Sequence, residues 1–142
     1  MKRRDFLQTV PGATLGLGAL TATAGCLSDD GDYDVGMQSN AFVPETIEIS
    51  VGDEVVWKNT GSRNHTVTAY ESQIPEGADY FASGDFTSEQ AARDAWAKQL
   101  DGGGDIRPGA SFSHAFEVAG TYAYFCIPHE PAGMVGTVVV TE

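Results

Sequence analysis

The feature that most constrains the fold of this chain is a series of short alternating segments between residues 46 and 142. In these segments apolar residues, many of them β-branched, tend to recur at every second position, which is the pattern of a strand with one buried face. Turn-forming residues such as Gly and Pro lie near most of the boundaries. The predicted strands are 46–50, 54–59, 65–70, 111–116, 121–126 and 134–142. Several short strands at this spacing predict an all-β protein, and we expect a Greek-key β-sandwich.

One segment between the predicted strands departs from this pattern. Residues 71–105 are polar and acidic, have few β-branched side chains, and contain the sequence TSEQAARDAWAKQL. Thr87 is a candidate N-cap with Gln90 three residues later as its reciprocal partner, and the sequence DGGGD predicts where the helix ends. We therefore expect a short helical insertion that packs on the outside of the sandwich through Trp96.

The first 25 residues have the pattern of an export signal rather than of a folded domain. A basic start containing Arg3 and Arg4 precedes a weakly apolar stretch rich in Gly and Ala. The paired arginines suggest the export route for folded proteins. The sequence TAGC then places small residues directly before Cys26, which resembles the cleavage site of a lipoprotein. We expect a lipid on Cys26, a flexible acidic tether at 26–34 and a single domain at 35–142.

The residues alone leave two alternatives for Cys26. It could remain free after ordinary cleavage of the signal. It could also form a disulfide with Cys126, because two cysteines in an exported protein invite pairing. The disulfide would exclude Cys126 from any metal site, since one sulfur cannot serve as both a bridge and a thiolate ligand.

The charge of the chain is strongly negative. From Cys26 onward, five Lys and Arg residues stand against nineteen Asp and Glu residues, a net charge of −14. This balance argues against nucleic-acid binding, which needs basic patches. It favours solubility and is consistent with a high-salt environment, because extreme charge is a property of halophilic proteins. The 117 residues from Cys26 to the end suit one domain with a single core, and we expect a monomer.

The segment CIPHEPAGM gathers three residue types that are scarce in the rest of the chain. Cys126, His129 and Met134 lie within nine positions of a sequence with two cysteines, three histidines and three methionines. Thiolate and thioether sulfur suit copper(I), and imidazole suits copper in both oxidation states. Each residue alone would more often be structural. Their joint spacing, between a strand that enters and a strand that leaves, favours a metal site.

A type 1 copper site needs a second imidazole, which must come from elsewhere in the chain. Only His65 and His114 remain. His65 begins the predicted strand 65–70, where its side chain can reach a loop at the same end of the sandwich. His114 lies within a strand and shares its parity with Phe112 and Phe116, so we expect it to be structural. The expected copper ligands are therefore His65, Cys126, His129 and Met134.

These segments resemble a known family. CIPHEPAGMVGTVVV is similar to the copper loop of the plastocyanin-like blue copper proteins, the cupredoxins. FVPETIEISVGDEVVWKNTGSRNHTV resembles the part of that family which carries the first copper-binding histidine, and Thr66 stands where an asparagine is common. With the export signal and the acidic charge, the resemblance is to the halocyanin type. It implies one type 1 copper ion and an electron exit through the edge of His129.

The function implied by the resemblance is that of a one-electron carrier. It would shuttle electrons between membrane redox complexes, with redox proteins as its partners, at the outer face of the cell membrane. Because protein side chains fill all four coordination positions, none is open to a substrate, and we expect no enzymatic activity.

Two other classes of protein fit the sequence less well than an electron carrier. The alternative function is that of a copper carrier or storage protein, which would need an open, Met-rich site. Only Met37 and Met134 follow the signal. A hydrolase is disfavoured because methionine is a poor zinc ligand and Cys126 with His129 lacks a third, orienting group.

Overall fold

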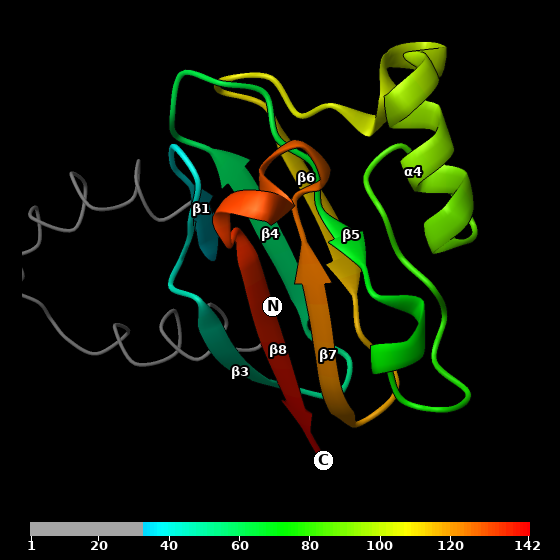
Figure 1. Ribbon diagram of the computed structural model, residues 1–142. Helices are drawn as coiled ribbons and strands as arrows, with labels where there is room; N and C mark the ends of the chain where they lie inside the picture. The colour runs from blue at the N-terminus through cyan, green and yellow to red at the C-terminus, as the bar shows by residue number, and fades with distance from the viewer. Residues whose placement is uncertain (1–32) are drawn as a thin grey trace, which may run out of the picture.

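The computed structural model describes residues 33–142, which form two four-stranded sheets packed face to face (Figure 1). The first sheet has the strand order β2-β1-β4-β6 and the second the order β3-β8-β7-β5. The strands are β1 Val35–Met37, β2 Phe42–Val43, β3 Thr46–Ser50, β4 Glu54–Asn59, β5 Thr68–Ala69, β6 Ser111–Ala115, β7 Gly120–Phe125 and β8 Val135–Thr141. The expected all-β sandwich is confirmed. The predicted export signal, Cys26 and most of the predicted tether, residues 26–32, lie outside the described residues.

Both sheets are mixed. β1 runs parallel to β4, and β3 runs parallel to β8, while the other neighbouring strands are antiparallel. β7 and β8 form the longest antiparallel pair of the second sheet, from Gly120 opposite Val140 to Phe125 opposite Val135. The connection between these two strands and the connection that follows β4 emerge at the same end of the sandwich (Figure 1). This end brings together segments that are far apart in the sequence.

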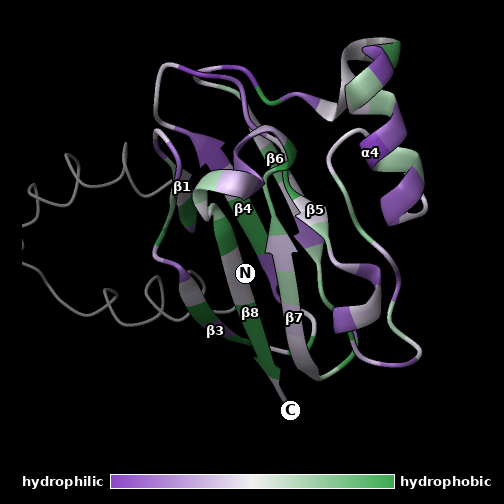
Figure 2. Cartoon of the chain, viewed as in Figure 1, coloured by the Kyte–Doolittle hydropathy of each residue, from purple (hydrophilic) through white to green (hydrophobic). Residues whose placement is uncertain are grey.

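The core between the sheets is centred on Trp57. Every second side chain of β4 is buried, and Trp57 is fully enclosed. Its ring lies edge-on to Tyr124 at 5.3 Å between centroids and stacks on Phe81 at 6.0 Å. Apolar residues also run along β8, which Figure 2 shows as a green stretch through the second sheet. Large rings packed from both sheets give the metal end a rigid base.

The predicted insertion contains one α-helix, α4 (Glu89–Lys98), at the side of the sandwich (Figure 1). Its N-cap is Ser88, whose hydroxyl accepts the N–H of Ala91, so the expected cap at Thr87 is wrong by one residue. The buried residues of the helix are Ala92 and Ala95. Within residues 33–142, no helix combines the length and the apolar character needed to cross a membrane.

Trp96, through which we expected the helix to pack, contacts the segment that follows the helix. It is half-buried and lies against Gly103, in the short 3-10 helix η3 (Leu100–Gly104) that follows α4. Gly103 has φ of 64°, and a Cβ there would come within 2.8 Å of the Trp96 backbone, so only glycine allows this close approach. Trp96 therefore helps the insertion to pack on itself.

Part of the insertion enters the sandwich. Ser83 N–H donates to the Val67 carbonyl at 2.7 Å, and Ala69 N–H donates to Phe81 at 3.1 Å. The Ser83 hydroxyl accepts the N–H of Val67 and donates to the Gly104 carbonyl. Residues 81–83 thus line the edge of the second sheet. β5 itself covers only Thr68–Ala69, shorter than the predicted strand 65–70.

Candidate metal centre

The loop between β7 and β8 is folded tightly around its own backbone. It contains the 3-10 helix η4 (Ile127–Ala132). Cys126 N–H donates to the Met134 carbonyl at 3.1 Å, and Met134 N–H donates to the His129 carbonyl at 3.2 Å. His129 N–H in turn donates to the Cys126 carbonyl at 3.2 Å. The three predicted loop ligands are therefore tied to one another through the main chain, which fixes where each side chain begins.

His65 is held at the same end by a different set of bonds. It forms an isolated β-bridge with Ile106, in which the two residues exchange N–H···O bonds of 3.2 and 2.7 Å. The side-chain amide of the buried Asn59, at the end of β4, donates to the carbonyls of Arg63 and Ile106 at 2.6 and 2.7 Å. This amide joins the segments before and after the insertion, so the insertion does not loosen His65.

The side chains of three predicted ligands converge. The ligand atoms of His65, Cys126 and His129 all lie within 4.8 Å of one another. The Cys126 sulfur is 3.5 Å from Nδ1 of His65 and 3.4 Å from Nδ1 of His129. The two imidazole rings are 4.8 Å apart between centroids. Both rings thus direct the same nitrogen toward one sulfur, as a shared cation would require.

Met134 completes the donor set. Its side chain is fully buried, and its carbonyl accepts the N–H of Cys126 at the base of the loop. Two imidazoles, one thiolate and one thioether are the donors of a type 1 copper site, with the thioether as the weak axial ligand. His65, Cys126, His129 and Met134 form such a site. The geometry and chemistry of these residues fit copper.

Burial sets the protonation of these ligands when no cation is bound. It lowers the pKa of His65 to about 4, with the charges of His129 and Arg63 acting in the same direction. Burial, followed by Arg63, also lowers the pKa of His129. Burial raises the pKa of the Cys126 thiol to about 11, against hydrogen bonds that lower it. At neutral pH both imidazoles can bind a cation directly, whereas the thiol must first lose its proton.

Thr66, which the sequence marks only as a departure from the common asparagine, supports the cysteine loop. Its N–H donates to the Cys126 sulfur at 3.4 Å, and its hydroxyl accepts the N–H of Ile127 at 2.9 Å. The same hydroxyl lies 3.0 Å from that of Thr68. Thr66 follows His65, and its hydroxyl bonds the residue that follows Cys126. It therefore links the segments that carry these two ligands. A side-chain link from this position to the cysteine loop is present even though the residue is not asparagine.

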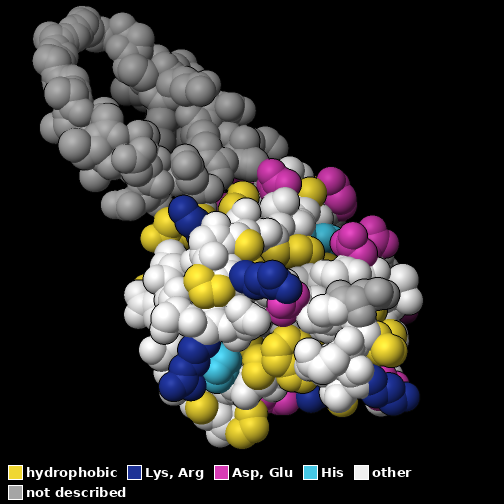
Figure 3. Space-filling model, turned by 90° about the horizontal axis from the view of Figure 1, so that it is seen from above, with side chains coloured by type: hydrophobic (Ala, Val, Ile, Leu, Met, Phe, Trp, Pro, Cys, Tyr) yellow, Lys and Arg dark blue, Asp and Glu magenta, His cyan; other side chains and the backbone are white. Residues whose placement is uncertain are grey.

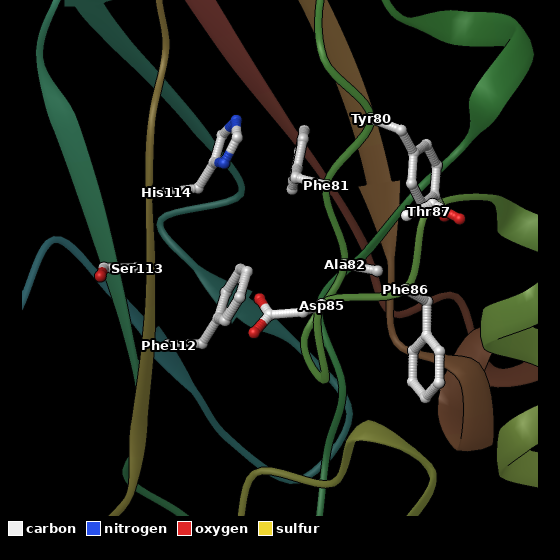
Figure 4. Close-up of a pocket in the computed structure, with 9 residues that line it drawn as sticks. All are labelled: Tyr80, Phe81, Ala82, Asp85, Phe86, Thr87, Phe112, Ser113 and His114. Atoms are coloured by element: carbon white, nitrogen blue, oxygen red, sulfur yellow. The ribbon is translucent and has the colours of Figure 1, made fainter.

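His114 stays away from the metal centre, as expected. Its ring stacks on Phe81 at 4.6 Å and is perpendicular to Phe116 at 4.7 Å. Figure 4 shows His114 and Phe112 along one wall of a cleft of about 190 Å³, with Asp85 pointing toward the Phe112 ring. Burial lowers the pKa of His114. Its contacts are those of a structural aromatic ring.

Comparisons with known proteins agree with this geometry. The family model described as copper binding proteins, plastocyanin/azurin family, matches residues 30–141. Plastocyanin of Vicia faba is 37% identical over 102 residues, covering 70% of this chain and 87% of that protein. Chloroplastic plastocyanin of Tetradesmus obliquus is 32% identical over 133 residues, covering 92% and 74%. A mutant plastocyanin of fern, solved oxidised and reduced, has a TM-score of 0.52 at 26% identity, covering 75% of this chain and 98% of that one.

Proposed function

Because the chain belongs to the plastocyanin/azurin family of copper-binding proteins, we propose that it carries single electrons between redox proteins at the outer face of a cell membrane. The copper, when bound, supplies a one-electron couple. The chain holds its four donors in a fixed arrangement. Because the ligands are tied by backbone bonds, they move little when the oxidation state changes, which favours rapid electron transfer.

The observation that carries this function is the closed donor set. His65, Cys126 and Met134 are fully buried, and His129 is the one ligand of the four that reaches the surface. A substrate would find no open coordination position, which distinguishes this site from those of metalloenzymes. The edge of the His129 ring is therefore the route by which an electron would enter or leave.

The surface around His129 suits transient contact with another protein. Pro131, Ala132 and Gly133 form an exposed rim of small and apolar residues beside it. Seen from above (Figure 3), hydrophobic side chains and several Lys and Arg side chains share this end of the molecule, and most of the visible acidic side chains lie toward one edge. A small apolar rim allows close approach without strong binding, which a carrier needs for fast release.

Charge is unevenly distributed between this end and the rest of the molecule. Residues 33–142 contain five Lys and Arg against sixteen Asp and Glu, a net charge of −11. The loop segments 60–64, 105–110 and 127–134, which surround the site, contain two residues of each sign and are neutral in sum. The negative charge therefore lies almost entirely away from the metal end, so that end can approach a partner without net repulsion.

The membrane location is a proposal supported by the sequence. Small residues precede Cys26, and a short acidic segment follows it. A carrier held beside its partners has a higher effective concentration than one that diffuses freely. Stable anchoring takes two acyl chains, because a single chain binds a membrane only marginally. Detergent phase partitioning with mass spectrometry of the N-terminal peptide tests this. An unmodified Cys26, or a disulfide from it to Cys126, would refute the anchor.

We also propose that the protein is of the halocyanin type and works at high salt. The acidic composition, with a net charge of −14 after the signal, supports this assignment. The unfolding midpoint of the copper protein, measured from 0.1 M to 3 M KCl, tests it. Stability that rises steadily with salt is expected. A midpoint that does not depend on salt would contradict a high-salt specialisation.

The electron-transfer function has a direct optical test. The copper(II) protein should be intensely blue because of charge transfer from the Cys126 thiolate, and ascorbate and ferricyanide should bleach and restore the colour. Cys126→Ser should abolish the colour. A colourless copper-loaded wild type would refute the assignment. Rapid loss of copper(I) to a competing chelator would instead favour a copper carrier or storage protein.

A further inference from the structure

The insertion makes one contact with the metal loop that the function described above does not use. We propose that Arg93, on α4, is a positioning residue that holds the segments next to two of the loop ligands, Cys126 and His129, so that the insertion is part of the support of the copper site. This inference rests on the proposed function. It gives the insertion a role that the sequence does not reveal.

The guanidinium of Arg93 forms an ion pair with Glu130, the residue that follows His129. Its NH1 atom is 2.9 Å from Oε1 of Glu130, and its NH2 atom is 3.3 Å from Oε2. Two parallel bonds of this kind fix the orientation of a carboxylate as well as its distance. The Tyr70 hydroxyl donates a third bond to Oε2 of Glu130 at 2.6 Å. Glu130 is therefore held from two directions by residues outside its own loop.

The same guanidinium covers the residue that precedes Cys126. Arg93 lies 4.3 Å above the centroid of the Phe125 ring, a cation–π contact. The Tyr70 ring stacks on Phe125 at 4.3 Å between centroids with an interplanar angle of 27°. Phe125 is fully buried as a result. Arg93 and Tyr70 thus each touch both Phe125 and Glu130.

These contacts link four residues into a closed ring of contacts at the metal loop: Arg93, Tyr70, Phe125 and Glu130. One peptide bond joins Phe125 to Cys126, and another joins His129 to Glu130. The ring therefore restrains one ligand from its N-terminal side and the other from its C-terminal side. Movement of η4 away from β7 would break the Glu130 contacts of Arg93 and Tyr70 together. Such cooperation separates this ring from an isolated surface ion pair, which contributes little.

The helix that carries Arg93 is itself anchored. Glu89, one turn earlier, accepts from Arg93 Nε at 2.9 Å, so the side chain is oriented from its own helix. The N–H of Glu71 donates to the Glu89 carboxylate at 2.9 Å, and the N–H of Glu89 donates to that of Glu71 at 3.1 Å. Ala92 and Ala95 are buried on the inner face of α4. The guanidinium is thus presented by a rigid element.

The test compares Arg93→Met with Arg107→Met. Both changes remove a guanidinium, but among the described residues Arg107 forms an ion pair only with Asp105, and its side chain is largely exposed. In the copper-free protein, Arg93→Met should speed hydrogen exchange of the Gly133 and Met134 amides by about tenfold, as expected when a local opening becomes easier. Arg107→Met should leave these rates unchanged. Equal rates in the two variants would overturn the proposal.

The copper-loaded protein gives a second readout. Arg93→Met should shift the thiolate charge-transfer band and the reduction potential, and it should slow electron self-exchange several-fold, because a looser His129 rearranges more. Arg93→Lys should restore these properties only in part, since a lysine keeps the charge but cannot form the two parallel hydrogen bonds to the Glu130 carboxylate. Complete restoration by lysine, or no change in Arg93→Met, would show that geometry at Glu130 does not matter.

A double-mutant cycle locates the effect. In a Glu130→Gln background, Arg93→Met should change loop exchange less than it does in the wild type, because the shared contact is already weakened. Fully additive effects of the two substitutions would refute the proposed cooperation among the four residues. Failure of the carrier function would look different: a wild type without blue colour refutes the proposed function, while the copper-free exchange rates still report on Arg93.

Discussion

Replacing Thr66 by valine should destabilise the metal loop without removing a ligand. The change keeps the shape of the side chain and the backbone N–H that donates to the Cys126 sulfur, but it removes a buried hydroxyl. That hydroxyl accepts the Ile127 N–H at 2.9 Å and lies 3.0 Å from the Thr68 hydroxyl. The Ile127 N–H and the Thr68 hydroxyl would then each lack their hydrogen bond to residue 66.

The size of the effect follows from these two partners. A buried group left without a hydrogen bond costs about 1–3 kcal/mol. The Ile127 amide cannot turn elsewhere, whereas the Thr68 hydroxyl can rotate, so about 2 kcal/mol in total is expected. For a domain of this size, that corresponds to a melting temperature lower by roughly 8 °C. Thr66→Ser keeps the hydroxyl, so it should preserve most of the stability that Thr66→Val loses.

Urea unfolding of the copper-free protein measures this difference. Thr60→Val is the matched control, because the Thr60 hydroxyl is exposed and makes only a 3.3 Å bond to the Met37 carbonyl. The control should change the free energy of unfolding by less than about 0.5 kcal/mol. If Thr66→Val matched this control, or if Thr66→Ser were as unstable as Thr66→Val, the role assigned to the hydroxyl would be refuted.

Three further predictions test other parts of the structure. Met134→Leu should keep the blue colour and raise the reduction potential, because a lost sulfur donor destabilises copper(II) more than copper(I); an unchanged potential in spectroelectrochemistry would point to a different fourth ligand. Copper binding at pH 7 should release one proton, since the Cys126 thiol has a pKa of about 11 and His65, at about 4, is already neutral. Affinity should therefore rise about tenfold per pH unit up to pH 9, and calorimetry in several buffers that found three protons would contradict this. Gly136→Ala would place a Cβ 2.5 Å from the hydroxyl of the buried Tyr124 ring, so unfolding should become easier by about 1–3 kcal/mol; an unaltered urea midpoint would show that the ring can yield.

Local signals were enough to predict most of the sandwich. The strands 46–50 and 54–59 match the structure residue for residue, because alternation and turn residues act over a few positions. The strand expected at 65–70 is shorter in the structure because residues before Thr68 bond instead to Ile106 and Ser83. Those partners are distant in sequence, and no periodicity in the segment reports them.

The ligands could be predicted because each of them is a rare residue type at a recognisable spacing. The residues that support them could not. Thr66 is an ordinary strand residue by composition, and Arg93 lies 37 positions before Glu130 on a helix whose docking the sequence does not specify. The N-cap of α4 is another position that residue type alone did not predict. Thr87 and Ser88 are both good caps by type, and the helix uses the second.

The separation of charge along the molecule has a consequence for how it meets other surfaces. A body that is neutral at the metal end and strongly negative elsewhere has a dipole moment, so the field of a negatively charged partner exerts a torque that turns the metal end forward before contact. In dilute salt this alignment would raise the share of collisions that present His129. At 1 M salt the Debye length falls to about 3 Å, and the torque vanishes beyond direct contact. In concentrated brine, then, collisions would be randomly oriented, and only the fit of the short apolar rim could select the productive ones.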